Sequence, residues 1–295
     1  MALIHVDFFS EVLGMSSQME VILPQETEGQ IGIGHVEKQS KYPVLYLLHG
    51  MTDNQTIWTR NTSIERYAAE HGIAVVMPNA HLGWYTDMKY GFKYFTFISE
   101  ELPELCERFF PCISGETKDR FVAGNSMGGY GAFKLGLTCP EKYAGIASLS
   151  GGFGLDICDR LSNDNFYPTL GEDIFGNLEE FRGSEHDLFA LAEKRIEEKV
   201  LMPKFYMWCG IDDFLLEQNR QMRNKLQELN YDYTYTESEG DHSWKYWDIW
   251  IQDILKWIDA IRNGGGVTWH ASRIVQPSTS YGRGGRFNFT ATSEK

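Results

Sequence analysis

The sequence predicts an α/β fold in which helices cover both faces of a mostly parallel sheet. Short apolar runs, each closed by glycine or proline, recur along the chain and are typical of parallel strands buried on both faces. Between them lie segments whose apolar residues have helical spacing. Alternation of such strands and helices is the signature of a parallel sheet with crossover helices. The 295 residues are enough to form a substantial core.

Each strand is expected where an apolar run is short and continuous. The runs predicted as parallel strands span residues 44–48, 73–77, 121–123, 146–149 and 205–209. Alternating positions in residues 19–23 indicate antiparallel edge strands before the parallel part. A last strand is expected at residues 231–235.

The helices are predicted from apolar residues that recur on one face. The three sets are Phe95, Ile98, Leu102, Leu105 and Phe109, then Leu215, Met222, Leu226 and Leu229, then Trp247, Ile251, Leu255 and Ile258. Spacing of this kind places an apolar stripe against the sheet and leaves the other side to solvent.

One catalytic domain is expected over residues 1–262. Within it, residues 156–181 are rich in Asn, Asp and Gly with scattered aromatics, which indicates an irregular excursion over the sheet. The chain becomes rich in Gly, Ser and Thr in residues 263–295. That segment lacks the apolar surface needed to order itself, so a flexible tail is expected.

The composition restricts the classes of partner. Lys and Arg number 27 against 41 Asp and Glu, a net charge of −14, which repels nucleic acid and anionic membranes. A small neutral substrate is therefore expected, with neither a nucleic acid nor a membrane as partner. The sequence does not decide the oligomeric state, and a homo-oligomer stays open.

Cysteine usage and the N-terminus indicate a cytoplasmic protein. Five cysteines, an odd number without a CxxC pair, are typical of reduced thiols. The first residues lack the basic and apolar regions of a signal peptide, and no apolar run approaches the ~18 residues of a transmembrane helix.

The segment Gly124-Asn125-Ser126-Met127-Gly128 matches the pattern G-x-S-x-G. An apolar run precedes it and a helical pattern follows it. Strand, sharp turn and helix form the nucleophile elbow of the α/β-hydrolase fold, in which a strained turn exposes the serine oxygen. The flanking glycines let strand and helix approach closely. Ser126 is therefore the predicted nucleophile, and the fold is predicted to be an α/β-hydrolase.

A serine hydroxyl is a poor nucleophile without a neighbouring base. In this fold the base is a histidine that follows the serine and an acid along the chain. Three histidines follow Ser126: His186 lies in a charged segment, His270 in the expected tail, and His242 in a polar loop before the last amphipathic helix. That loop follows the last strand, from which a side chain can reach the elbow. His242 is the predicted base.

The acid is expected directly after the strand at residues 205–209. Asp212 and Asp213 are adjacent there, and Asp213 is preferred, with Asp212 as the alternative. One of the two is expected to cap the following helix. The acid would hold His242 in the required tautomer.

Two backbone amides are expected to stabilise the oxyanion. Met127 begins the helix after the serine, and Met51 follows the strand at residues 44–48. The neighbouring His49 is interpreted as structural. No metal site is indicated, and the absence of GxxxxGK[ST] and GxGxxG motifs implies no nucleotide cofactor.

Aromatic residues in loops near strand ends are expected to line the substrate pocket. They are Trp58, Trp84, Tyr85 and Trp244, and an ordinary place in the core or on the surface is the alternative for each.

Four segments together resemble the esterase D family. They are Leu47-Leu48-His49-Gly50-Met51, Gly124 to Ala132, Cys209 to Leu215, and Gly240-Asp241-His242-Ser243-Trp244. Within the family, the chain most resembles the bacterial tributyrin esterases, relatives of feruloyl and acetyl-xylan esterases and of S-formylglutathione hydrolases. The likeness covers most of residues 1–262. It implies cofactor-free hydrolysis of short-chain acyl esters and supports Asp213 over Asp212.

The expected protein is a serine carboxylesterase that acts on acetyl to butyryl esters, or on aryl esters such as feruloyl, through an acyl-enzyme on Ser126. A thioesterase of the S-formylglutathione hydrolase type, an acyltransferase and an inactive binding protein are the alternatives. The S-formylglutathione hydrolases carry a cysteine shortly after the oxyanion-loop glycine, whereas this chain has Thr52-Asp53 there. This difference weighs against the thioesterase alternative.

Overall fold

The computed structural model describes residues 1–27, 31, 38–154, 157, 161, 167–264 and 273–274. Within these residues one sheet of nine strands forms the centre of the molecule, in the order β1-β2-β4-β3-β5-β6-β7-β8-β9. The strands are β1 (Ala2–Ser10), β2 (Met15–Leu23), β3 (Val44–Leu48), β4 (Ala74–Pro78), β5 (Arg120–Asn125), β6 (Gly145–Leu149), β7 (Lys204–Gly210), β8 (Tyr233–Ser238) and β9 (Arg273–Ile274).

The mostly parallel sheet predicted from the apolar runs is confirmed. Strands β3 to β9 pair in parallel with one another. Strands β1 and β2 form an antiparallel hairpin, and β2 also pairs antiparallel with β4. Every residue of β3, β4, β5 and β6 is buried, as continuous apolar runs predict for strands covered on both faces.

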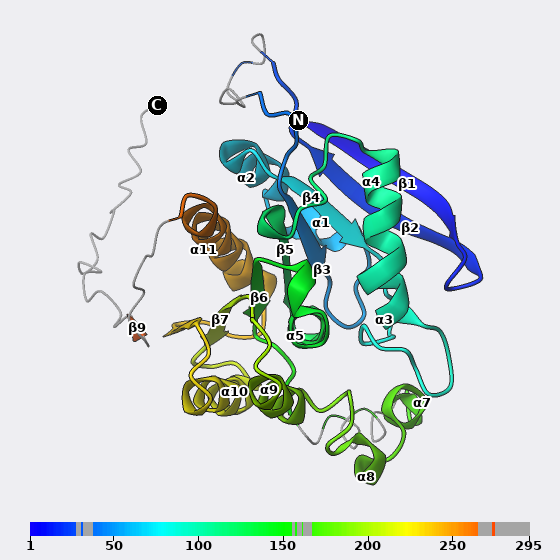
Figure 1. Cartoon of the computed structure of the whole chain (residues 1–295), viewed down its shortest axis with the longest axis vertical. Helices are drawn as coiled ribbons and strands as arrows, with labels where there is room; N and C mark the ends of the chain where they lie inside the picture. The colour runs from blue at the N-terminus through cyan, green and yellow to red at the C-terminus, as the bar shows by residue number, and fades with distance from the viewer. Residues whose placement is uncertain are drawn as a thin grey trace, which may run out of the picture.

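Helices cover both faces of this sheet (Figure 1). They are α1 (Ile57–Asn61), α2 (Ile64–His71), α3 (Tyr94–Thr96), α4 (Leu102–Phe109), α5 (Met127–Thr138), α7 (Leu170–Phe175), α8 (Leu178–Phe181), α9 (Leu188–Glu197), α10 (Leu216–Glu228) and α11 (Trp244–Arg262). Side chains that alternate along β3 divide the core: Leu45 and Leu47 pack with α1, α2 and α11, whereas Tyr46 and Leu48 pack with α4, α5, α9 and α10.

The helix predicted over residues 95–109 contains a π turn at Phe97–Glu101 between α3 and α4. Pro103 follows the turn and has no N–H to bond the Ser99 carbonyl four residues earlier. The Lys142 ammonium donates to that carbonyl instead, at 2.9 Å. Leu102 and Leu105, which follow the turn, still lie against the core as the spacing predicted. Phe109, the last residue of α4, is 44% exposed, so that part of the prediction is wrong.

The predicted excursion at residues 156–181 is more regular than expected where the structure describes it. It contains the short helices α7 and α8, and the carbonyls of Asp173 and Ile174 accept hydrogen bonds from the amides of Tyr90 and Lys89. Of the predicted tail, β9 pairs in parallel with β8. The other residues of the tail beyond Gly264 lie outside the described residues.

Across the described chain, every helix falls short of the length or the apolar content that a membrane crossing requires.

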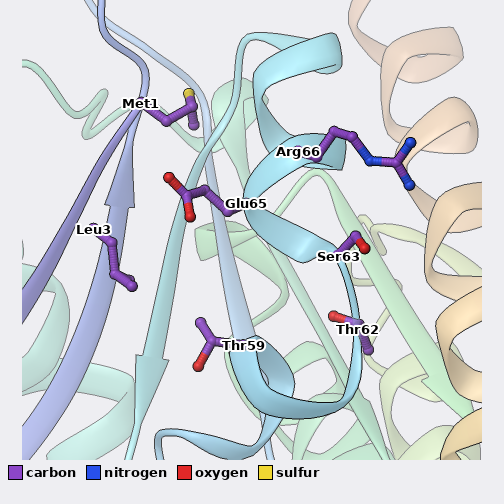
Figure 2. Close-up of a pocket in the computed structure, with 7 residues that line it drawn as sticks. All are labelled: Met1, Leu3, Thr59, Thr62, Ser63, Glu65 and Arg66. Carbon is purple, nitrogen blue, oxygen red and sulfur yellow. The ribbon is translucent and has the colours of Figure 1, made fainter. Parts of the chain in front are cut away.

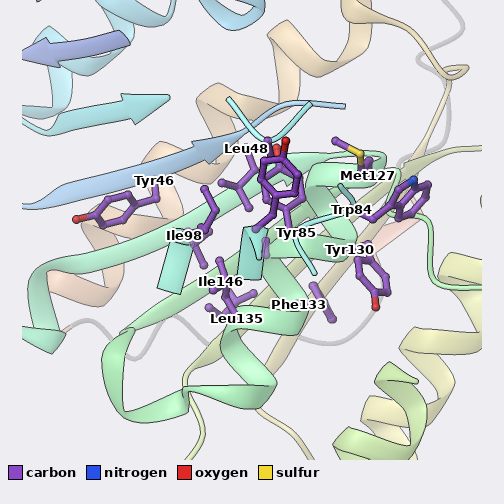
Figure 3. Close-up of a cluster of buried hydrophobic side chains, with 14 of the residues drawn as sticks. Tyr46, Leu48, Trp84, Tyr85, Ile98, Met127, Tyr130, Phe133, Leu135 and Ile146 are labelled. Atoms are coloured by element: carbon purple, nitrogen blue, oxygen red, sulfur yellow. The ribbon is translucent and has the colours of Figure 1, made fainter. Parts of the chain in front are cut away.

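The core beside α5 provides a test of the packing. Phe133 is fully buried there, with ring centroids 4.8 Å from Phe153 and 5.1 Å from Phe205 (Figure 3). We expect Phe133→Ala to lower the free energy of unfolding by about 3–5 kcal/mol, because it leaves a cavity between two layers. Urea denaturation followed by circular dichroism measures the change. Phe109→Ala is the matched control and should cost less than ~1 kcal/mol, and equal losses in the two variants would contradict this packing.

Candidate active site

Ser126 occupies the sharp turn between β5 and α5. Its φ of 53° and ψ of −116° lie in a region that L-residues rarely adopt. The turn is held by backbone hydrogen bonds, in which the Ser126 amide donates to the Leu149 carbonyl at 2.9 Å. The Ser126 carbonyl accepts from the amides of Tyr130 and Gly152, each at 3.2 Å. The neighbouring strand and helix thus fix the strained conformation expected of a nucleophile elbow.

The two glycines of the motif are required by close backbone contacts. A β-carbon on Gly128 would lie 2.5 Å from the Leu48 carbonyl oxygen, and one on Gly124 would lie 2.5 Å from the carbonyl of Gly128. No other residue fits at either position without a shift of strand or helix. The flanking glycines therefore let α5 start directly against the ends of β3 and β5, as the sequence predicted.

Ser126, His242 and Asp213 form one hydrogen-bonded series. The Ser126 Oγ lies 3.0 Å from His242 Nε2, and His242 Nδ1 lies 2.9 Å from Asp213 Oδ2 and 3.1 Å from Oδ1. An ionised carboxylate can only accept, so Nδ1 carries the proton and Nε2 accepts from the serine hydroxyl. This tautomer is the one that a general base beside a serine needs.

Adjacent strands bring the acid and the histidine together. Strands β7 and β8 are in register at Gly210 and Ser238, so the loops after them start side by side. A β-carbon on Gly210 would lie 2.2 Å from the Gly240 carbonyl oxygen, which also accepts from the Asp212 amide at 2.9 Å. Asp212 is exposed, whereas the Asp213 side chain is buried and points at His242. The structure thus places Asp213, and not its alternative, beside the histidine.

Burial of the Asp213 carboxylate acts to raise its pKa, but its partners outweigh this effect. The hydrogen bond and the charge of His242 lower the pKa most, followed by the Leu215 amide, which donates to Oδ1 at 2.8 Å. The net pKa is below the ordinary value, so the carboxylate stays ionised. The N-cap residue of α10 is Leu215, and no side chain caps the helix, so the expectation that one of the two aspartates caps it is wrong. Asp213 instead accepts from the amide of that N-cap residue.

Two aromatic rings enclose the His242 imidazole. The ring centroid of Phe214 lies 4.5 Å away and that of Trp247 lies 4.9 Å away, edge-on. Trp247 is itself fixed, because its Nε1 donates to the Ser150 hydroxyl at 3.2 Å. From the sequence, Trp247 was expected only on one face of a helix, and Phe214 was not expected at the site. The position of Phe214 directly after the predicted acid, Asp213, is the feature of the sequence that could have indicated its place beside His242.

The two residues predicted to donate oxyanion amides, Met127 and Met51, lie in segments that adjoin the serine. Met127 is the first residue of α5, where an amide has no acceptor within the helix. Met51 lines the same cavity as Ser126. The loop before it runs beside the elbow, since a β-carbon on Gly50 would lie 3.1 Å from the Asn125 side-chain nitrogen. The arrangement suits two amides that converge on one oxygen.

His49 supports this loop from beneath. Its Nδ1 donates to the Gly50 carbonyl at 2.8 Å, and its Nε2 accepts from the Ala80 amide at 3.0 Å. Burial lowers the pKa of His49 to about 4, so the ring is neutral at neutral pH. The Tyr85 hydroxyl donates to the His49 carbonyl at 2.9 Å. His49 therefore has the structural role that the sequence analysis gave it.

A cavity of about 400 Å³ opens beside Ser126. Its wall consists of Met51, Thr52, Trp84, Ser126, Gly152, Ile157, Leu161, Phe214, Leu215, Gln218 and His242. Ile157 and Leu161 belong to the predicted excursion over the sheet, residues 156–181. Gly152 directly follows β6, where no sequence motif marks it.

Of the four aromatic residues expected in this wall, the structure places only Trp84 there. Trp58 is fully buried on the α11 face of the sheet, where its Nε1 donates to the Leu48 carbonyl at 3.1 Å and its ring meets Trp244 at 4.8 Å. Tyr85 is fully buried beneath the oxyanion loop (Figure 3). Each of these three has a packing or hydrogen-bonding partner elsewhere, which holds it away from the cavity.

A second cavity, also about 400 Å³, lies between β1 and helices α1 and α2 (Figure 2). Its lining residues are Met1, Leu3, Thr59, Thr62, Ser63, Glu65 and Arg66, and none of them is a predicted site residue. Among the described residues, no group of three His, Cys, Asp or Glu side chains could hold a metal ion.

The Esterase family model, described as "Putative esterase", matches residues 10–160. The chain belongs to this esterase family. An acetyl esterase of Caldicellulosiruptor saccharolyticus is 32% identical to it over 270 residues, which are 88% of this chain and 99% of the relative.

Solved structures agree with this assignment. The fluorophosphonate-binding serine hydrolase F of Staphylococcus aureus has a TM-score of 0.78 and 34% identity, and an S-formylglutathione hydrolase of the same organism has 0.76 and 35%. Both alignments cover 87% of this chain and 98% of the other. This esterase therefore has the α/β-hydrolase fold and is a carboxylic ester hydrolase.

The buried His49 makes the esterase sensitive to acid. The folded protein binds a proton on His49 only near pH 4, whereas the unfolded chain binds it near pH 6.5. Stability should therefore fall as the pH drops from 6.5 to 4, by up to about 3 kcal/mol from this residue.

We expect His49→Gln to make the loss of stability over this pH range shallower, since glutamine does not titrate. Some loss should remain, because burial also lowers the pKa of His186 to about 3. Urea unfolding at a series of pH values measures the slope, and an unchanged slope would contradict the assignment to His49.

Proposed function

We propose that this esterase hydrolyses short-chain acyl esters, acetyl to butyryl, through an acyl-enzyme on Ser126. The observation that carries the proposal is the series of hydrogen bonds from Ser126 through His242 to the buried Asp213, at the edge of the cavity. These distances, 3.0 Å and 2.9 Å, are those of a serine next to its base and of a base held by its acid.

In the first half of the reaction, His242 Nε2 takes the Ser126 proton as Oγ attacks the ester carbonyl. The amides of Met127 and Met51 would stabilise the oxyanion, helped by the positive end of the α5 dipole. His242 then gives its proton to the leaving alcohol, while the ionised Asp213 stabilises the imidazolium.

In the second half, water attacks the acyl-enzyme. His242 removes the water proton, the same amides stabilise the second oxyanion, and Ser126 regains its proton as the acid leaves. The residues used here need neither a metal nor an organic cofactor, so we propose a cofactor-free reaction.

The size and lining of the cavity support a small neutral substrate. A volume of about 400 Å³ is near the lower end for small-molecule sites. Trp84, Ile157 and Leu161 contribute apolar surface that suits a short acyl chain or an aryl ester such as a feruloyl ester. The relative from Caldicellulosiruptor saccharolyticus is named an acetyl esterase, and acetyl is a short acyl group. With a net charge of −14 and few cysteines, we propose a cytoplasmic enzyme for neutral esters.

A thioesterase of the S-formylglutathione hydrolase type is the second candidate. It is favoured by the similarity to the S. aureus enzyme of that name, at 35% identity. The Thr52-Asp53 sequence after the oxyanion loop weighs against it. Comparison of an acetyl thioester with an acetyl ester of the same chain length separates the two functions.

The nucleophile is tested with p-nitrophenyl acetate, butyrate and octanoate. We expect the wild type to hydrolyse the acetate and butyrate fastest, and Ser126→Ala to lower kcat at least about a thousandfold, because no acyl-enzyme can form. A spectrophotometric assay of p-nitrophenol release measures both. Equal, slow rates in the two proteins would exclude an esterase reaction at Ser126.

The acid is tested with two adjacent substitutions. We expect Asp213→Asn to lower kcat by about 10³–10⁴, because an amide donor facing Nδ1 favours the wrong tautomer of His242. Asp212→Asn, its matched control, is exposed and should stay within about twofold of the wild type. Steady-state kinetics on p-nitrophenyl acetate measure kcat for both variants. A large loss of kcat in Asp212→Asn with little change in Asp213→Asn would assign the acid to Asp212.

A further inference from the structure

Phe214 has an unusual position for a phenylalanine. Its side chain lines the cavity and is 67% exposed, although the residues on either side of it, Asp213 and Leu215, are buried. Single exposed apolar residues are common on protein surfaces. Phe214 differs from these residues because it lines the cavity and its ring contacts the proposed base, His242. It therefore forms part of the surface that a substrate meets.

The geometry of His242 indicates which part of the substrate meets Phe214. The leaving oxygen must come within about 2.6–3.2 Å of Nε2 to receive its proton. The group attached to that oxygen therefore emerges beside the imidazole. Two rings contact the imidazole. Trp247 packs edge-on and is 5% exposed, so it offers little surface to a substrate. Phe214 remains accessible and lines the cavity.

The acyl chain meets a different wall. Trp84 is 6% exposed, and its ring lies against Gly152, where a β-carbon would be 3.1 Å from it. The Gly152 amide donates to the Ser126 carbonyl, so this buried wall adjoins the nucleophile itself. A buried wall suits the acyl group that stays on the enzyme, and an exposed ring suits the alcohol that departs into solvent.

We propose that Phe214 is a specificity-determining residue that receives the leaving alcohol and favours flat, aromatic alcohols. This inference rests on the proposed function, because it requires alcohol release at Ser126 and His242. In the step concerned, the bond from Ser126 Oγ to the acyl carbon forms, the bond from that carbon to the alcohol oxygen breaks, and the serine proton passes through His242 to that oxygen. A planar leaving group can stack on the Phe214 ring, whereas a saturated ring of the same size gains only contact area.

The experiment compares phenyl acetate with cyclohexyl acetate, which share the acyl group and the size of the leaving ring. The measured quantity is the ratio of their kcat/KM values in each protein, so that intrinsic leaving-group reactivity cancels between proteins. We expect Phe214→Ala and Phe214→Leu to lower this ratio about threefold to tenfold, and Phe214→Tyr to preserve it. The leucine variant keeps apolar bulk and removes only the aromatic ring.

Tyr90→Ala is the matched control, since Tyr90 is an aromatic residue of similar exposure, 66%, outside the cavity wall. Its ratio should equal that of the wild type. A fall of both kcat/KM values by the same factor in Phe214→Ala would show that the ring only shields His242, and would overturn the proposal. Failure of the wild type to exceed Ser126→Ala on either ester would instead overturn the proposed function, so the two failures are distinguishable.

Discussion

The close approach of α5 to the carboxyl ends of β3 and β5 sets the position of the catalytic groups. The contact exists because Gly128 has no β-carbon where it passes the Leu48 carbonyl, 2.5 Å from where that carbon would lie. The approach fixes the turn at Ser126 and puts the first amide of α5 beside the serine oxygen. It also brings the end of β3 next to the elbow, so the loop that carries Met51 starts in the right place. One backbone contact thus positions both the proposed nucleophile and the two amides proposed to bind the oxyanion.

Backbone strain is concentrated around this contact. Thr52, Trp84, Tyr85, Ser126 and Ser150 all have positive φ, and all lie in the loops that surround the site. Such conformations cost of order 1–3 kcal/mol each and persist only where the surroundings over-determine them. Here the surroundings are a sheet whose central strands are fully buried. The stability of the core therefore offsets the strain that exposes the reacting groups.

The hydrogen-bonded series of Ser126, His242 and Asp213 could be predicted from the sequence, because each residue follows a backbone feature that the sequence displays. Ser126 lies between two glycines after a strand, Asp213 follows a strand that ends at a glycine, and His242 lies in a polar loop before the last helix. The cavity wall carries no such pattern. In the sequence, Trp58 and Trp84 both follow polar or glycine-rich segments after strands. Only their tertiary partners distinguish them: the Leu48 carbonyl for Trp58 and Gly152 for Trp84. The exposure of Phe109 has a similar origin, since the spacing does not reveal that the helix ends at this residue.

The burial of α5 affects how the enzyme can move. Every residue from Met127 to Leu137 is buried, including Lys134, whose ammonium donates to His186 Nδ1 at 2.8 Å. Backbone amides in such a buried helix exchange with deuterium mainly through large-scale unfolding, so we expect α5 to be among the slow-exchanging elements of the described residues. The more exposed loops around the cavity are expected to exchange faster. Exchange in α5 then serves as the internal reference against which the opening of those loops is measured.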